Sequence, residues 1–260
     1  MTAWYDIHGE GPPVVLVHAG IADSRMWEPQ VGPFSKSHTV ARTDLPGYGR
    51  SPIETDVVSF SDSVRKAMDA AGINRSALVG VSLGGRAALE LAAESPERVS
   101  ALVLVGPGID DHDWSEQVGS FDAAEEEALE RGDLDAAIDI NLRLWLAGPR
   151  RTLDAIEPQV RELVAEMQRD AFQLQQGHSD VRLARLDPPA SKRLGDIRVP
   201  TLIVTGDEDL EDIHRIADRL TREIAGATRA TIADAAHLPN LERPAEFNRI
   251  VLDFLRDHGV

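Results

Sequence analysis

The length, composition and charge of the chain describe an acidic globular protein and exclude several classes of partner. It has 260 residues, 42% hydrophobic and 27% charged, which suits one large α/β domain with an insertion, or two domains. The formal net charge of -17 argues against nucleic acid and against an anionic membrane surface, because binding to either needs a basic protein surface.

Cysteine content and the N-terminal residues narrow the chemistry and the expected location. Since the chain has no cysteine, it has no disulfide, no thiol nucleophile and no thiolate metal site. The first residues lack the charged and apolar regions of a signal peptide, and no apolar run is long enough to cross a bilayer. We therefore expect a cytoplasmic protein that does not contact a membrane.

Segments typical of strands and helices alternate through the first part of the chain. The predicted strands are residues 3–8, at a sheet edge, and the apolar runs 14–17, 39–43, 77–81 and 99–105. A helix is predicted at about 61–71, with Ser61 or Asp62 as its N-cap and Gly72 at its end. This alternation predicts an α/β fold: a mostly parallel, twisted sheet with helices on both faces.

The alternation stops between residues 109 and 194, where apolar spacing predicts helices and no strand. The helical stretches are 122–131, 134–146 and 153–176. We predict that this region is a helical cap, inserted between two segments of an α/β core, 1–108 and 195–260. The core pattern resumes with strands at 201–205 and 228–232 and helices at 211–224 and 244–258.

The stretch from Ala77 to Leu89 holds the strongest motif. An apolar strand runs directly into an Ala/Leu-rich helix, and Gly80–Gly84 forms the corner. Glycines on both sides of Ser82 relieve crowding there, and Gly85 lets the helix pack closely. Such a corner forces its central residue into a strained backbone conformation with the hydroxyl above the sheet. The pattern is a nucleophile elbow and predicts Ser82 as the nucleophile.

Polar residues follow other predicted strands, at the edge where reactive groups of a parallel sheet gather. Asp207 and Asp209 follow one strand, and His237 follows the last. The chain order Ser, Asp, His is the order expected for a catalytic triad on such a sheet. Serine needs an adjacent base, which His237 can be, and a carboxylate must orient the imidazole. Both aspartates can supply that carboxylate, although Asp207 also suits a turn or helix cap.

These motifs resemble the alpha/beta-hydrolase superfamily, in its group of capped esterases, lactonases and related small-molecule hydrolases. Ala19 stands where the family usually has glycine. The match covers both core segments, while the cap carries no recognised motif. The matching segments are 18–20 with Trp27, 44–51, 80–85, 200–209, and His237 with 242–244.

The resemblance implies roles for individual residues. In the family the triad acid usually lies three residues after the strand-ending glycine, here Gly206, which selects Asp209 and leaves Asp207 as the alternative. The start of the helix places the backbone N–H of Leu83 in the oxyanion hole, and Gly20 is the expected second donor. The remaining candidates are Trp27 and Trp145, as substrate-binding residues with core packing as the alternative.

Other polar residues are predicted to be structural. His18 and Asp44 are expected to hold their own loops, and Glu125–Glu127 is expected to be a solvated helix face. His112, His178 and His214 are expected at the surface. No spacing of His, Asp or Glu indicates a metal site, and no glycine-rich phosphate loop occurs, so we expect no cofactor.

The sequence therefore predicts a cofactor-independent serine hydrolase that cleaves a small, partly hydrophobic carboxylic ester or lactone through an acyl-enzyme. Hydrolysis of a carbon–carbon bond, or acyl transfer, on the same fold is the first alternative. A ligand receptor with an idle triad is a second. Ser82 argues against epoxide hydrolysis and dehalogenation, which in this superfamily generally use an aspartate nucleophile.

Overall fold

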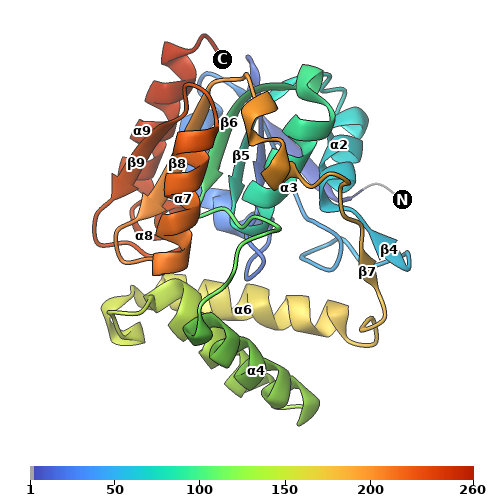
Figure 1. Ribbon diagram of the computed structural model, residues 1–260, viewed down its shortest axis with the longest axis vertical. Helices are drawn as coiled ribbons and strands as arrows, with labels where there is room; N and C mark the ends of the chain where they lie inside the picture. Colours follow the sequence, from blue (N-terminus) through green and yellow to red (C-terminus); the bar gives the residue numbers. More distant parts are fainter. Residues whose placement is uncertain (1–2) are drawn as a thin grey trace.

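A seven-stranded sheet forms the centre of the computed structural model, which describes residues 3–260 (Figure 1). The strand order is β1-β3-β2-β5-β6-β8-β9; β1 pairs antiparallel with β3, and the other neighbours pair in parallel. This arrangement confirms the predicted α/β class. The strands are β1 (Tyr5–His8), β2 (Pro13–Val17), β3 (Thr39–Thr43), β5 (Ser76–Val81), β6 (Val99–Val105), β8 (Thr201–Gly206) and β9 (Thr228–Ile232).

Helices cover both faces of the sheet, which explains why its central strands are continuous apolar runs. Every residue of β5 is buried. The side chains of α2, α3 and α7 pack on one face and those of α1 and α9 on the other. These helices, with one short helix, are α1 (Glu28–Phe34), α2 (Phe60–Ala70), α3 (Leu83–Glu94), α7 (Glu211–Glu223), α8 (Pro239–Glu242) and α9 (Pro244–Asp257).

Three further helices lie across one end of the sheet, below the core in Figure 1. They are α4 (Glu116–Glu130), α5 (Leu134–Asn141) and α6 (Pro158–Gln175), and α5 continues as a π-helical segment, Leu142–Ala147. We refer to residues 109–194 as the cap. The boundaries of the core and the cap, 1–108, 109–194 and 195–260, stay a prediction.

Local hydrogen bonding moves some elements away from their predicted positions. The cap contains a short strand, β7 (Arg182–Leu183), which pairs with β4 (Val57–Val58), so the prediction of no strand there was wrong. A strand of only two residues shows too little alternation of apolar and polar positions to be recognised from the sequence. Helix α2 is capped by Ser59, whose side chain accepts from the Asp62 N–H, and not by Ser61 or Asp62 themselves.

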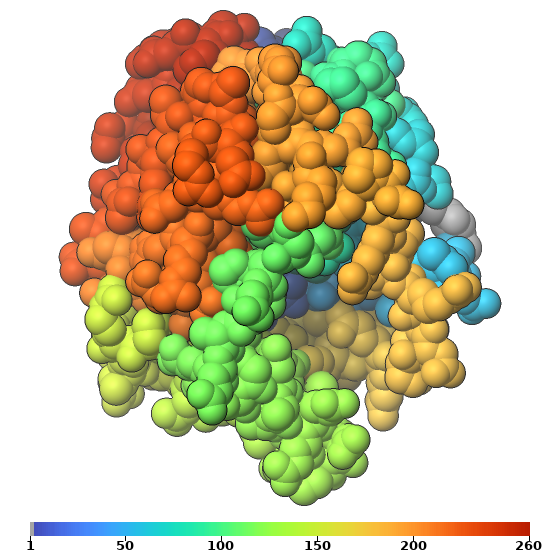
Figure 2. Space-filling view, viewed as in Figure 1, coloured from blue at the N-terminus to red at the C-terminus, as the bar shows by residue number. Residues whose placement is uncertain are grey.

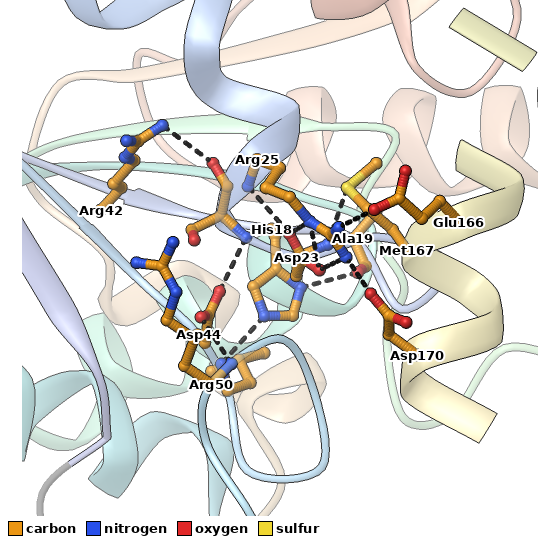
Figure 3. A network of polar contacts seen from close by, with 12 residues as sticks. His18, Ala19, Asp23, Arg25, Arg42, Asp44, Arg50, Glu166, Met167 and Asp170 are labelled. Atoms are coloured by element: carbon orange, nitrogen blue, oxygen red, sulfur yellow. Dashed lines mark hydrogen bonds and ion pairs between the residues drawn. The ribbon is translucent and has the colours of Figure 1, made fainter. Parts of the chain in front are cut away.

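Arg25 connects the core to the cap (Figure 3). It lies in a 3₁₀ turn after β2, and its guanidinium pairs with Asp23 at 2.7 Å. It also pairs with Glu166 at 2.7 Å and Asp170 at 2.5 Å, both on α6. The hydrogen bonds that Arg25 donates to Asp23 and to Asp170 raise the pKa of Arg25 despite its partial burial. This arginine therefore fixes α6 over the loop that follows β2.

The elbow between β5 and α3 depends on the absence of side chains at two positions. A Cβ added to Gly84 would lie 2.2 Å from the carbonyl oxygen of Val17, and one added to Gly80 would lie 2.3 Å from that of Gly84. Both carbonyl oxygens are backbone atoms, which cannot move aside without disturbing strand β2 or helix α3. The close approach of α3 to β2 and β5 therefore requires glycine.

We expect Gly84→Ala to lower the free energy of unfolding by about 2–4 kcal/mol, because the new methyl group would overlap the backbone of β2. Gly119→Ala is the matched control, since Gly119 lies in α4 with no atom within 4 Å of an added Cβ. That control should gain about 0.5–1 kcal/mol of helix propensity. Urea unfolding measures both; equal midpoints for Gly84→Ala and wild type would contradict the packing argument.

Candidate active site

Ser82 occupies the corner between β5 and α3 in a strained backbone conformation. Its φ of 52° and ψ of -112° lie in the left-handed half of the map, which residues with a side chain rarely adopt. Hydrogen bonds on both sides hold this conformation: the Ser82 N–H donates to Val105 O at 2.8 Å, and Ser82 O accepts from Arg86 N at 2.9 Å. Ser82 lines a cavity between the core and the cap.

His237 and Asp209 meet at the same end of the sheet. His237 lies between β9 and α8, and its Nδ1 is 2.9 Å from Oδ2 of Asp209. Both side chains are buried, and the other oxygen of Asp209 accepts from the Leu210 N–H at 2.8 Å. Because the carboxylate holds the Nδ1 proton, Nε2 keeps its lone pair and is available as a base.

The Nε2 atom of His237 makes no hydrogen bond with any residue in 3–260, Ser82 included. Ser82 and His237 nevertheless line the same cavity. A serine hydroxyl rotates about a single bond, and such contacts often tighten only when substrate binds. The structure therefore brings the three predicted triad residues to one place, and their catalytic role stays a prediction.

Asp207 makes no hydrogen bond to His237 and is not part of the group formed by Ser82, His237 and Asp209. Its backbone N–H donates to Ile232 O at 3.0 Å, and its carbonyl accepts from Arg150. Its Oδ1 is buried without a hydrogen bond to any described residue. The carboxylate beside the imidazole of His237 belongs to Asp209.

Gly106 completes the packing around the imidazole of His237 and was not among the residues predicted from the sequence. It follows β6 with a φ of +46°, and an added Cβ would lie 3.0 Å from Nδ1 of His237 and 3.3 Å from Oδ2 of Asp209. Any side chain here would push the pair apart. In the sequence, the signal for this role was the position of Gly106 directly after β6, the buried strand beside β5.

The two predicted oxyanion donors lie close together beside Ser82. Leu83 is the first residue of α3, so its N–H has no acceptor within the helix. A Cβ built on Gly20 would lie 3.7 Å from the Cβ of Leu83. Gly20 also lines the cavity that contains Ser82 and His237. This placement suits an oxyanion hole, and that role stays a prediction.

His18 holds two loops together, as the sequence analysis predicted (Figure 3). It is fully buried, its Nδ1 donates to Ala19 O at 2.8 Å, and its Nε2 accepts from the Leu45 N–H at 2.9 Å. Burial lowers the pKa of His18, although the nearby carboxylates of Asp44 and Asp23 act in the opposite direction. The imidazole is therefore neutral, because a second ring proton would face the Leu45 N–H.

Asp44 joins the same loops through its carboxylate. One oxygen accepts from the Ser24 N–H at 2.8 Å, and the other accepts from the Arg50 N–H at 2.9 Å. A Cβ on Gly49, whose φ is +52°, would lie 2.4 Å from this carboxylate. Asp44 is therefore enclosed by the turn that it stabilises, as predicted.

The cavity has a volume of about 240 Å³ and is formed by both the core and the cap. Trp145 lines it and packs on the imidazole of His237, with ring centroids 4.6 Å apart. Trp27 is fully buried in the core against Phe247 and does not line this cavity, so its predicted contact with substrate was wrong. The lining residues are Gly20, Ile21, Tyr48, Ser82, Glu125, Asn141, Trp145, Gln168, Phe172, Gln175 and His237.

A second, larger cavity of about 790 Å³ adjoins the first and shares four of its lining residues. Most of its other walls are apolar, including Ile53, Phe60 and Leu134. The surface in Figure 2 is hollowed between the green cap segment and the gold segment that follows α6. The shared residues are Tyr48, Glu125, Phe172 and Gln175.

Some residues assigned to the surface from sequence are not exposed. Glu125 is half-buried and lines both cavities, so the prediction of a solvated face was wrong for this member of the acidic run. His112 is half-buried and pairs with Asp212 at 2.9 Å. His214 is also half-buried, next to Arg229, whereas His178 is exposed as predicted.

Comparison with known proteins identifies the family. A family model described as the alpha/beta hydrolase fold matches residues 12–244. The chain belongs to this family. The resemblance that the sequence motifs indicated is thereby confirmed.

Relatives of this alpha/beta hydrolase carry different hydrolase names. It is 27% identical to a putative carbamate hydrolase, RutD, from Azorhizobium caulinodans, over 96% of this chain and 94% of the relative. It is 28% identical to 2-hydroxy-6-oxo-6-phenylhexa-2,4-dienoate hydrolase from Comamonas testosteroni, over 97% and 90%. The crystal structure of the enol-lactonase from Burkholderia xenovorans LB400 superposes with a TM-score of 0.79, at 27% identity over 97% and 96%.

Two further observations concern membranes and metals. None of the helices in residues 3–260 has the length and apolar character needed to span a bilayer. Within the same residues, no cluster of three or more His, Cys, Asp or Glu side chains is arranged to bind a metal ion.

The lowered pKa of His18 makes a prediction about stability in acid. The unfolded chain binds a proton at this histidine near pH 6.5, while the folded protein does not, so the free energy of unfolding should fall as the pH drops below about 6.5. His18→Asn should reduce this pH dependence in urea unfolding. It should also cost about 1–3 kcal/mol at higher pH, because the Leu45 N–H loses its acceptor.

The control for this prediction is His178→Asn, because His178 is exposed. It should keep the wild-type slope of stability against pH. If His18→Asn also kept the wild-type slope, titration of His18 would not contribute to acid sensitivity.

Proposed function

We propose that this alpha/beta hydrolase cleaves a small carboxylic ester or lactone through an acyl-enzyme on Ser82. The observation that carries the proposal is the buried pair of His237 and Asp209, 2.9 Å apart, on the wall of the cavity that contains the elbow serine. A free serine hydroxyl is a weak nucleophile, and an oriented neutral imidazole is the group that activates it. The family membership and the lactonase among its structural relatives support the same chemistry.

The reaction follows from these positions in two halves. Nε2 of His237 takes the proton from Ser82 Oγ as the oxygen attacks the carbonyl carbon, and Asp209 stabilises the imidazolium that forms. The backbone N–H groups of Leu83 and Gly20 donate to the oxyanion. The imidazolium then protonates the departing alkoxide, which leaves as an alcohol. Water repeats the sequence on the acyl-enzyme, releases the carboxylic acid and restores Ser82.

The same side chains support other bonds to an acyl carbon. Hydrolysis of a carbon–carbon bond or a carbamate, or acyl transfer, would use the same serine and differ in the leaving group or the acceptor. Relatives with dienoate hydrolase and carbamate hydrolase names motivate including such substrates in the assay. A receptor with an idle triad is the remaining alternative, and a fluorophosphonate probe should label Ser82 rapidly in a hydrolase but slowly or not at all in such a receptor.

Ser82→Ala should lower turnover of p-nitrophenyl esters and lactones by about 10⁴-fold or more, because it removes the nucleophile. The assay is a panel of esters of increasing acyl length, lactones, a carbamate and a diketone, with wild type and variant side by side. An unchanged urea midpoint shows that the variant is folded. Retention of most activity by Ser82→Ala would remove this residue from the proposed role.

Asp209→Asn should lower kcat by about 10³–10⁴-fold, because an amide no longer fixes the imidazole tautomer or stabilises the imidazolium. Asp207→Asn is the matched control, as the other aspartate of the same loop without a contact to His237, and should keep most of the activity. The same ester panel measures both. A larger loss in Asp207→Asn would assign the acid to Asp207.

A further inference from the structure

The cap contributes several polar side chains to the wall of the catalytic cavity, beside the aromatic rings of Trp145 and Phe172. Glu125 on α4, Asn141 at the end of α5 and Gln168 on α6 all line the cavity that contains Ser82. No lysine or arginine is among the described residues that line either of the two cavities. With Gln175, also on α6, this wall offers a carboxylate and three amides, without a lysine or arginine.

Among the oxygen atoms of this wall, the side-chain oxygen of Gln168 lacks a donor. Gln168 is 4% exposed, and its Oε1 makes no hydrogen bond with any residue of the described chain. The amide nitrogen of Asn141 donates to Ala137 O at 3.1 Å, and the Asn141 side chain also bonds to Glu125. Burial raises the pKa of the Glu125 carboxyl. Buried acceptors of this kind are normally paired, so a donor from a ligand would complete them.

Glu125 lies where the two cavities meet. It lines both, together with Tyr48, Phe172 and Gln175. Burial raises the pKa of Tyr48 to about 12, so its hydroxyl stays neutral, and this hydroxyl bonds to Gln175. A substrate with its carbonyl at Ser82 and a chain extending into the larger, mainly apolar cavity would therefore pass the carboxylate of Glu125.

We propose that the substrate carries a hydrogen-bond donor, an N–H, ammonium or hydroxyl group, on the chain that extends from its scissile carbonyl toward the larger cavity, and that Glu125 and Gln168 bind this donor. The inference rests on the proposed function, because it assumes that the reacting carbonyl lies at Ser82. Glu125 determines specificity and takes no part in bond cleavage. A carboxylate at the same position of the substrate would face Glu125 with no cation to compensate it, and is excluded.

The first test uses the wild-type protein and methyl esters of straight-chain acids, with six and eight carbons, that end in a methyl, hydroxyl, ammonium or carboxylate group. Acid release at mildly alkaline pH gives kcat/KM for each ester. At the better chain length, the hydroxyl and ammonium esters should exceed the carboxylate ester by at least about tenfold, because the site pairs with donors and repels anions. Equal values, or preference for the carboxylate ester, would overturn the inference.

The second test locates the preference in individual residues. Glu125→Gln should reduce the ratio of kcat/KM between ammonium and carboxylate esters by about tenfold. Glu126→Gln is the matched control, because the neighbouring Glu126 is exposed and lines neither cavity. Gln168→Leu should lower the ratio between hydroxyl and methyl esters, and provides a second variant if Glu125→Gln does not fold.

The outcomes separate this inference from the function on which it rests. Hydrolysis of all four esters without preference, or an unchanged ratio in both Glu125→Gln and Gln168→Leu, would reject the donor site alone. Failure to hydrolyse any ester of the series, with no labelling of Ser82 by the fluorophosphonate, would reject the proposed function and the donor site with it.

Discussion

The approach of α3 to β2 and β5 is the constraint on which the rest of the site depends. Gly84 places its Cα against the carbonyl of Val17, and Gly80 lies against the backbone of Gly84, so strand and helix meet with no side chain between them. This contact forces the strained conformation of Ser82 and exposes the first N–H of the helix. The positions of the proposed nucleophile and of one proposed oxyanion donor are therefore consequences of one packing contact.

Neighbouring loops are then fixed around that corner by buried polar groups. The imidazole of His18 and the carboxylate of Asp44 accept from backbone N–H groups of the loops after β2 and β3, and Arg25 extends the connection to α6 (Figure 3). Gly106 gives the imidazole of His237 its space beside Asp209. These polar groups fix the position of the cap, and of the loop that carries Gly20, relative to Ser82. Apolar contacts alone would not define these positions as narrowly.

The core and the cap contribute different kinds of side chain to the site. The core presents Ser82 and the paired imidazole and carboxylate of His237 and Asp209 at the carboxyl ends of parallel strands, where families with this architecture place their chemistry. The cap presents Glu125, Asn141 and Gln168 from three different helices to the same cavity. Reaction and recognition can thus vary separately, which fits relatives that share the fold and carry different substrate names.

The sequence by itself determined the α/β class, the elbow and the chain order of serine, aspartate and histidine, because these depend on short-range patterns and chain order; it left Asp207 and Asp209 open as the acid. Only the tertiary structure decided that Trp27 is buried, that β7 pairs with β4 and that Glu125 faces a cavity. Each of these depends on contacts between segments far apart in the chain. A charged residue on a cap helix has the same local pattern whether its face meets water or a substrate, so its partner is set by the packing of α4 over the core.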